Sequence, residues 1–181
     1  MGGRRLLPKT ENKLVLTWDD IRAQVSSICR SISADAEGWR PDYVVGLVRG
    51  GTIPATMISH YFSVPMYALK ISLRDSNSMD SETNCWMSED AVGYNEVPSK
   101  NILVVDDIND TGKTLKWLRD DWESTYPIAG AWKHVWGYNV RFATIVDNTS
   151  SLIHINYAGK SINKKQNDVW VEFPWEDWWL K

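Results

Sequence analysis

Cysteine and histidine are scarce in this sequence, and their scarcity excludes two classes of fold. The 181 residues include only two cysteines, Cys29 and Cys85, and three histidines. Two cysteines cannot build a disulfide framework, so both are expected as free thiols in a reducing, cytoplasmic environment. The histidines are scattered, and neither they nor the cysteines show the ligand spacing of a zinc site.

An excess of charge of one sign is also missing, and so is a long apolar run. The chain carries 20 Lys and Arg against 23 Asp and Glu. Without a basic stripe, counterion release cannot drive binding to a duplex, so nucleic acid is not an expected partner. No apolar run approaches the ~20 residues of a membrane span. At the amino terminus, Leu6 and Pro8 are incompatible with myristoylation and secretory signals, and residues 1–12 are predicted to be a disordered tail.

The remaining residues, 13–181, are enough for a single domain with its own core. Helices are expected at 18–34, where Thr17 is the candidate cap, at 53–62, and around Leu115, Leu118 and Trp122. Continuous apolar, β-branched runs are typical of strands that are covered on both faces. They predict strands at 43–48, 65–71, 101–105 and 140–146, with 152–157 as a further candidate. Alternating strands and helices predict an α/β fold, with a mostly parallel central sheet flanked by helices and ligands at the carboxyl ends of the strands.

Two segments do not follow these patterns. Residues 72–99 are rich in Ser, Asn, Asp, Glu and Gly without a sustained period, and we expect a flexible lid loop there. Residues 123–139 are irregular and rich in tryptophan. Most of the 11 tryptophans are expected to pack in the core or on surface patches.

The chemistry is expected in the segment Val104–Thr114. Three carboxylates, Asp106, Asp107 and Asp110, follow an apolar strand within five residues. Carboxylates so close together repel one another unless a cation or a polyhydroxyl ligand compensates them. The next residues, 111–114, offer hydroxyls, a glycine and amide N–H groups at a helix start, which together can bind an anion.

Two other interpretations of this segment were considered. A solvated turn with helix-capping acids would also use Asp and Asn, although it would not need the residues at 111–114. The Gly-Lys-Thr triplet at 112–114 is similar to a nucleoside-triphosphate P-loop. That motif requires glycine where Asp107 stands, so this interpretation fails.

The segment resembles the signature of the type I phosphoribosyltransferases: a strand, two adjacent acids, two residues, a third acid, Thr-Gly, and then Thr or Ser. The similarity is greatest to the bacterial xanthine-guanine enzymes, which act on 6-oxopurines. It also includes Val15–Asp19 as an opening strand and helix start, Val48–Gly51 as a pyrophosphate loop, and Trp170–Trp175 as a base-binding segment. The resemblance implies the type I phosphoribosyltransferase fold, with a small C-terminal hood for the base at about 148–181.

For the sugar phosphate, the resemblance implies that Asp106 and Asp107 hold the ribose hydroxyls of phosphoribosyl pyrophosphate, directly or through Mg²⁺. It implies that Arg49 and the Gly50 amide bind the pyrophosphate. The cradle for the 5-phosphate would be formed by Thr111, Gly112, Lys113 and Thr114.

For the base, the resemblance implies that Asp110 is the general base near N7 of a purine. Trp170 would stack on the ring, and the Val171 backbone would hydrogen-bond to its edge. Where the purine enzymes have a lysine that contacts the oxygen at position 6, this sequence has Asn148. An amide can both donate and accept, so the preference between 6-oxo and 6-amino bases stays open. The lid also lacks the Ser-Tyr pair of the relatives.

These observations predict an enzyme of purine salvage. It would use Mg²⁺ to transfer ribose 5-phosphate from phosphoribosyl pyrophosphate to guanine, xanthine or hypoxanthine, releasing pyrophosphate. The alternatives are an enzyme of the same fold that acts on another acceptor, and a nucleotide-sensing regulator with this fold. The resemblance also implies a homo-oligomer, because relatives form dimers or tetramers.

Overall fold

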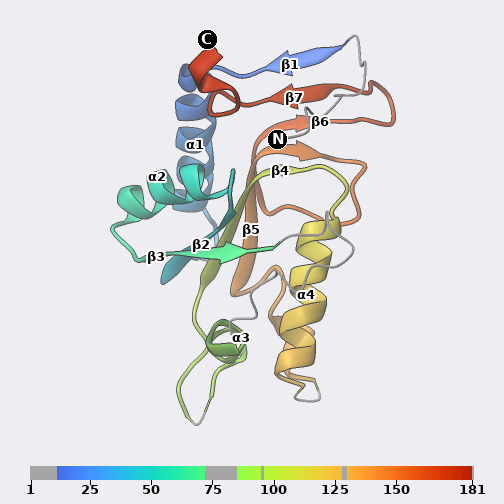
Figure 1. The fold of residues 1–181 in the computed structure, drawn as a ribbon. Helices are drawn as coiled ribbons and strands as arrows, with labels where there is room; N and C mark the ends of the chain where they lie inside the picture. The colour runs from blue at the N-terminus through green and yellow to red at the C-terminus, as the bar shows by residue number, and fades with distance from the viewer. Residues whose placement is uncertain (1–11, 72–84, 95, 128–129, 181) are drawn as a thin grey trace.

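The computed structural model describes residues 12–71, 85–94, 96–127 and 130–180 (Figure 1). The strands are β1 (Lys13–Val15), β2 (Tyr43–Val48), β3 (Met66–Lys70), β4 (Ile102–Asn109), β5 (Val140–Asn148), β6 (Tyr157–Ile162) and β7 (Trp170–Glu172). The helices are α1 (Trp18–Ser33), α2 (Thr52–Phe62), α3 (Cys85–Val92) and α4 (Lys113–Thr125), with short 3-10 turns η1 (Ala131–His134) and η2 (Trp178–Leu180). None of the helices in these ranges has the length and apolar character needed to cross a membrane.

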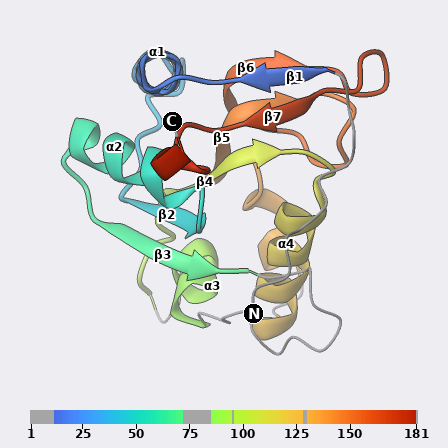
Figure 2. The same cartoon turned by 45° about the horizontal axis from the view of Figure 1, so that its top comes forward.

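The central sheet is parallel, in the order β3-β2-β4-β5-β6. The α1 and α2 helices cover one face of it, and α3 and α4 cover the other. A separate parallel ribbon pairs β1 with β7; Figure 1 shows it above β6 at the top of the molecule, and Figure 2 turns this end toward the viewer. The expected α/β fold with a mostly parallel sheet flanked by helices is therefore confirmed.

The central strand β4 shows why the apolar runs predicted a parallel sheet. Leu103 and Val105 pack in the cluster under α1 and α2, whereas Ile102 and Val104 pack in the cluster under α3 and α4. All four side chains are fully buried. A strand that is buried on both faces has to be apolar at consecutive positions. The run from Ile102 to Val105 has this character.

The first helix follows its sequence signals closely. The Thr17 hydroxyl accepts a hydrogen bond from the Asp20 backbone N–H, and the Asp20 carboxylate accepts one from the Thr17 backbone N–H. This capping box satisfies amide groups that the first turn of α1 leaves without helical partners. The apolar stripe of the helix is buried at Ile21, Val25, Ile28 and Ile32.

Three expectations differ from the structure or fall partly outside it. The expected strand at 152–157 is wrong, because β6 begins only at Tyr157; Ile153 and Ile155 are buried in a connection that runs outside the sheet ladder. Half of the expected lid, residues 72–84 and 95, lies outside the described residues. The rest includes α3, so the expectation that 72–99 has no regular structure is wrong there. The predicted tail also lies outside them except at Asn12, whose carbonyl accepts a hydrogen bond from the Trp170 N–H.

A buried ion-pair network holds the loop after α1 against the sheet. The Arg141 guanidinium is 2.6 Å from the Asp35 carboxylate and 3.0 Å from Glu37. It also donates to the Tyr157 hydroxyl, and its charge lies over the Trp39 ring. The Arg141 side chain is only 8% exposed, so these partners replace the water that it loses on folding.

Asp35 and Glu37 form a matched pair for testing this network, because both contact Arg141 but their exposures are 14% and 77%. We expect Asp35→Asn to lower the free energy of unfolding by about 2–4 kcal/mol, since it leaves a buried arginine without its nearest counter-charge. Glu37→Gln should change it by less than about 0.5 kcal/mol. Urea denaturation of both variants measures the difference, and equal losses would contradict the importance of burial.

Candidate active site

A large cleft lies at the carboxyl ends of β2 and β4, where the order of the sheet reverses direction. Chain connections run from β2 through α2 to β3 on one side, and from β4 through α4 to β5 on the other. Open α/β sheets bind ligands at such a switch point. The cleft has a volume of about 870 Å³. Its walls include Arg49, Gly50, Lys70, Asp106, Asp107, Asp110, the 111–114 loop, Lys164, Trp170, Val171, Phe173, Trp175 and Glu176.

Asp106 and Asp107 are adjacent near the carboxyl end of β4, and both are half-buried. Burial raises the pKa of Asp106 well above its usual range, and the adjacent Asp107 charge raises it further. Burial also raises the pKa of Asp107 to about 6, with a smaller contribution from the Glu176 charge. None of the ion pairs among the described residues involves either carboxylate. The pair therefore carries negative charge that this part of the protein does not neutralise.

This donor set fits a magnesium ion bound together with a ligand. Mg²⁺ prefers oxygen ligands and is usually held by one or two carboxylates plus substrate phosphates and water. Within the described ranges, no group of three or more His, Cys, Asp or Glu side chains could hold an ion alone. An ion at Asp106 and Asp107 would complete its shell with ligand oxygens and water.

The loop after β2 is pressed against these carboxylates. A Cβ atom on Gly50 would lie 1.7 Å from the Asp107 carboxylate, and one on Gly51 would lie 2.4 Å from the Val105 carbonyl oxygen. The peptide bond between Val48 and Arg49 is cis. Only glycine allows the backbone to come so close, and the loop places the Arg49 side chain at the cleft beside the acidic pair.

The 111–114 loop leads into α4 on the opposite wall. Gly112 has a φ of +80° and serves as the N-cap, and a Cβ atom there would lie 2.9 Å from the Ile153 nitrogen. Both the backbone conformation and the close packing require glycine at this position. The loop and the first turn of α4 present amide N–H groups, hydroxyls and the Lys113 ammonium to the cleft, which is a suitable cradle for a phosphate.

Asp110 faces the cleft together with a lysine that the sequence analysis did not identify. The Lys164 ammonium is 2.9 Å from the Asp110 carboxylate. Lys164 comes from the loop between β6 and β7, where two adjacent lysines and several polar residues gave no signal beyond a solvated loop. In the folded protein Lys164 lies beside Asp110, which precedes it by 54 residues in the chain.

The C-terminal hood supplies the aromatic wall of the cleft. Trp170 and Val171 lie on β7, and Trp175 stacks on Phe173 with ring centroids 4.8 Å apart. The Phe173 backbone N–H donates to the Glu176 carboxylate, which also faces the cleft and was not identified from the sequence. A flat ligand can lie against this wall while its substituents face Asp110 and Lys164.

Asn148 does not lie where the sequence analysis expected it. Its side chain is buried, with 5% exposure, and it is not among the residues that line the cleft. The amide donates to the Asp110 carbonyl oxygen and accepts from the Lys164 backbone N–H. Because both ends of the amide are used inside the protein, the expected contact between Asn148 and the base conflicts with this geometry.

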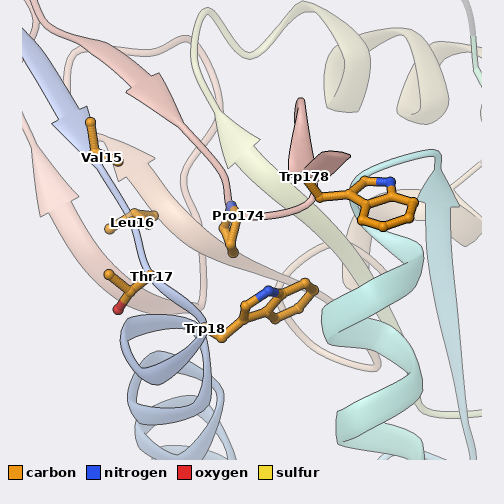
Figure 3. Close-up of a pocket in the computed structure, with 6 residues that line it drawn as sticks. All are labelled: Val15, Leu16, Thr17, Trp18, Pro174 and Trp178. Atoms are coloured by element: carbon orange, nitrogen blue, oxygen red, sulfur yellow. The ribbon is translucent and has the colours of Figure 1, made fainter. Parts of the chain in front are cut away.

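A second hollow, of about 490 Å³, lies behind the hood (Figure 3). Its walls are Val15, Leu16, Thr17, Trp18, Pro174 and Trp178. Figure 3 shows the Trp18 ring below Pro174, with the Trp178 ring beyond it. Among the residues that the structure describes, no charged side chain lines this hollow, so it does not fit a sugar phosphate.

Comparisons with known proteins agree with this geometry. The phosphoribosyl transferase domain family matches residues 15–178. A xanthine-guanine phosphoribosyltransferase of Cereibacter sphaeroides is 25% identical, over 89% of this chain and 85% of its own length. A hypoxanthine-guanine phosphoribosyltransferase of Schizosaccharomyces pombe is 23% identical, over 91% of this chain and 89% of its own.

Solved structures share the fold. The crystal structure of a purine phosphoribosyltransferase from Pyrococcus horikoshii has a TM-score of 0.64 at 21% identity, over 92% of this chain and 95% of that one. The family match covers most of the chain and includes every residue from β1 to the hood that lines the cleft. The chain therefore belongs to the phosphoribosyl transferase domain family, and its sequence-based recognition as a type I phosphoribosyltransferase is confirmed.

Proposed function

We propose that this enzyme transfers ribose 5-phosphate from phosphoribosyl pyrophosphate to a 6-oxopurine, releasing pyrophosphate, with Mg²⁺ as cofactor. The observation that supports it most is the meeting of an uncompensated acidic pair, a phosphate cradle and an aromatic wall in one cleft. The relatives named above are named for xanthine, guanine and hypoxanthine, which supports a 6-oxopurine acceptor and a role in purine salvage.

The sugar phosphate is held at three places. Asp106 and Asp107 take the ribose hydroxyls, directly or through Mg²⁺, which when bound neutralises charge on the pyrophosphate. The residues Thr111, Gly112, Lys113 and Thr114 hold the 5-phosphate. Arg49 and the Gly50 amide hold the pyrophosphate on the other wall. The two anion sites thus position the sugar between them, with its reactive carbon toward the hood.

The base is held on the hood side. Trp170 stacks on the ring and the Val171 backbone hydrogen-bonds to its edge, while the Asp110 carboxylate faces N7. As the bond between the sugar carbon and pyrophosphate breaks, positive charge develops on the sugar and the base nitrogen N9 forms the new bond. Asp110 accepts the N7 proton, and the nearby carboxylates stabilise the developing positive charge electrostatically.

A panel of purine and pyrimidine bases tests the reaction as a whole. With phosphoribosyl pyrophosphate and Mg²⁺ present, we expect pyrophosphate release with guanine, hypoxanthine or xanthine, and its loss when EDTA removes the metal. Absence of release with every base would overturn the proposal. Release that is indifferent to EDTA would overturn the assignment of Mg²⁺.

The role of Asp110 can be tested by Asp110→Asn, which removes the proton acceptor but keeps the size of the side chain. We expect kcat to fall by about 10²-fold or more, because a lost general base typically costs 10²–10⁴-fold. The KM for phosphoribosyl pyrophosphate should change little. Asp120→Asn is the matched control, since Asp120 lies on the surface of α4 in an ion pair with Lys116. Equal turnover in both variants would remove Asp110 from the mechanism.

Asp107→Asn should weaken Mg²⁺-dependent binding and yet stabilise the ligand-free protein. The pKa of Asp107 is raised by burial to about 6, above the ~3.9 of an exposed carboxyl, so its contribution to stability declines as the pH rises from 4 to 6. At pH 7.5, replacing this desolvated charge should raise the free energy of unfolding by about 1–2 kcal/mol. The gain should vanish near pH 4, where the folded protein already holds the proton.

Thermal denaturation of Asp107→Asn at both pH values measures this effect, and calorimetric titration with Mg²⁺ and phosphoribosyl pyrophosphate measures binding. Asp120→Asn is again the control and should show no pH-dependent gain. A variant less stable than the parent at pH 7.5 would contradict the stated cause of the raised pKa.

Trp170→Ala should raise the KM for the base by roughly 5- to 100-fold, because stacking of a base on an aromatic ring contributes about 1–3 kcal/mol. The KM for phosphoribosyl pyrophosphate should stay within about twofold, since the ring contacts only one substrate. Trp178→Ala provides the control, because Trp178 faces the hollow behind the hood. If the KM for the base is unchanged, Trp170 serves the packing of the hood alone.

A further inference from the structure

The cations that line the cleft stand on different walls. Arg49 and Lys70 come from the ends of β2 and β3, and Lys113 comes from the start of α4. Among the described residues, Lys164 is the cleft cation supplied by the loop that leads into β7, the strand of Trp170. It is therefore the cation on the side where the proposed function places the base.

Lys164 is tied to the carboxylate that the proposed function makes the general base. Its ammonium lies 2.9 Å from the Asp110 carboxylate, and its side chain is 18% exposed, against 46% for Asp110. An ammonium that is mostly covered requires an acceptor in place of water. It offers three donors and no acceptor, so it favours a ligand oxygen and disfavours an amino group.

One buried amide holds both residues. The Asn148 Nδ2 atom donates to the Asp110 carbonyl oxygen at 2.7 Å, and the Asn148 Oδ1 atom accepts from the Lys164 backbone N–H at 3.0 Å. Ser150 also donates to this Oδ1 atom. The loop after β4 and the loop after β6 are thus connected through a single side chain at the end of β5.

We propose that Asn148 is a positioning residue that holds Asp110 and Lys164 as one unit. This unit recognises an edge of the base on which an N–H group and a carbonyl oxygen lie side by side. The carboxylate accepts the proton of the N–H group while the ammonium donates to the oxygen. The N7 and position-6 oxygen of a 6-oxopurine form such an edge, so Lys164 is the specificity-determining residue. This inference rests on the proposed function.

The arrangement also accounts for the asparagine at position 148. A lysine there would replace an amide that is 5% exposed and hydrogen-bonded at both ends. The positive charge at the cleft is supplied instead by Lys164, 16 residues further along the chain. The Asn148 amide holds the Lys164 backbone and so sets where the ammonium lies.

Replacing Lys164 tests the specificity directly. We expect Lys164→Met to lower the ratio of kcat/KM for hypoxanthine to kcat/KM for adenine by about tenfold to a hundredfold, the effect of one charge-assisted hydrogen bond. The KM for phosphoribosyl pyrophosphate should not change. Lys165→Met is the matched control, because Lys165 is the exposed neighbour and should leave the ratio unchanged. An unchanged ratio in Lys164→Met would overturn the inference.

Asn148→Ala tests the positioning role, with Thr149→Ala as its control, because the exposed Thr149 hydroxyl donates to the Ile162 carbonyl oxygen. If Asn148 acts through Lys164, Asn148→Ala lowers the same ratio, and adding it to Lys164→Met lowers the ratio no further. Independent, multiplying effects would overturn the positioning role. Should Asn148→Ala fail to fold, the comparison of Lys164→Met with Lys165→Met still decides whether Lys164 selects the base.

The parent enzyme separates this inference from the proposed function. A parent that releases pyrophosphate with none of the bases refutes the proposed function. A parent that is active on hypoxanthine, with a base ratio that Lys164→Met does not alter, refutes the role of Lys164 alone.

Discussion

Two half-buried carboxylates that follow the fully buried run of β4 are the constraint around which the cleft is organised. The β4 strand is apolar on both faces until Asp106 and Asp107, whose pKa values burial raises. The neighbouring backbone packs directly against them, because Gly50 approaches Asp107 more closely than a residue with a side chain could. The fold holds unfavourable charge at this point, which the cation and sugar of the proposed function would relieve. Function and stability therefore oppose each other at this one position in the chain.

Those parts of the fold that have a strong local signal could be predicted from the sequence. The capping box at Thr17 and the apolar runs of β2 and β4 were recognised because burial on one or both faces determines residue type at each position. The α3 helix was not recognised, because among its described side chains Met87 and Ala91 alone join the buried hydrophobic core, too few to show a period. Ile153 and Ile155 looked like a strand because they are buried, but their segment connects two strands instead of joining the ladder.

The candidate site divides in the same way. The residues from Asp106 to Thr114 are contiguous, so they form a motif that can be recognised in the sequence. Lys164 and Glu176 reach the cleft only through tertiary structure, and neither has a pattern around it. The resemblance to relatives placed Asn148 at the base, whereas the structure buries its amide and puts the ammonium of Lys164, from another loop, at the cleft beside Asp110. Sequence position alone could not reveal this, because the Asn148 amide meets the Lys164 backbone N–H, and the Lys164 ammonium meets the Asp110 carboxylate, only in the folded chain.

The ribbon of β1 and β7 has a consequence for the order in which the site is assembled. Lys13 and Glu172 pair across 159 residues of sequence. During synthesis, the earliest strand leaves the ribosome long before its partner exists, whereas β2, β3 and β4 find one another sooner. Contacts of such long range form late because the loop that they close is large. The wall of the cleft that is proposed to bind phosphate can thus form in a nascent chain that still lacks the hood proposed to bind the base.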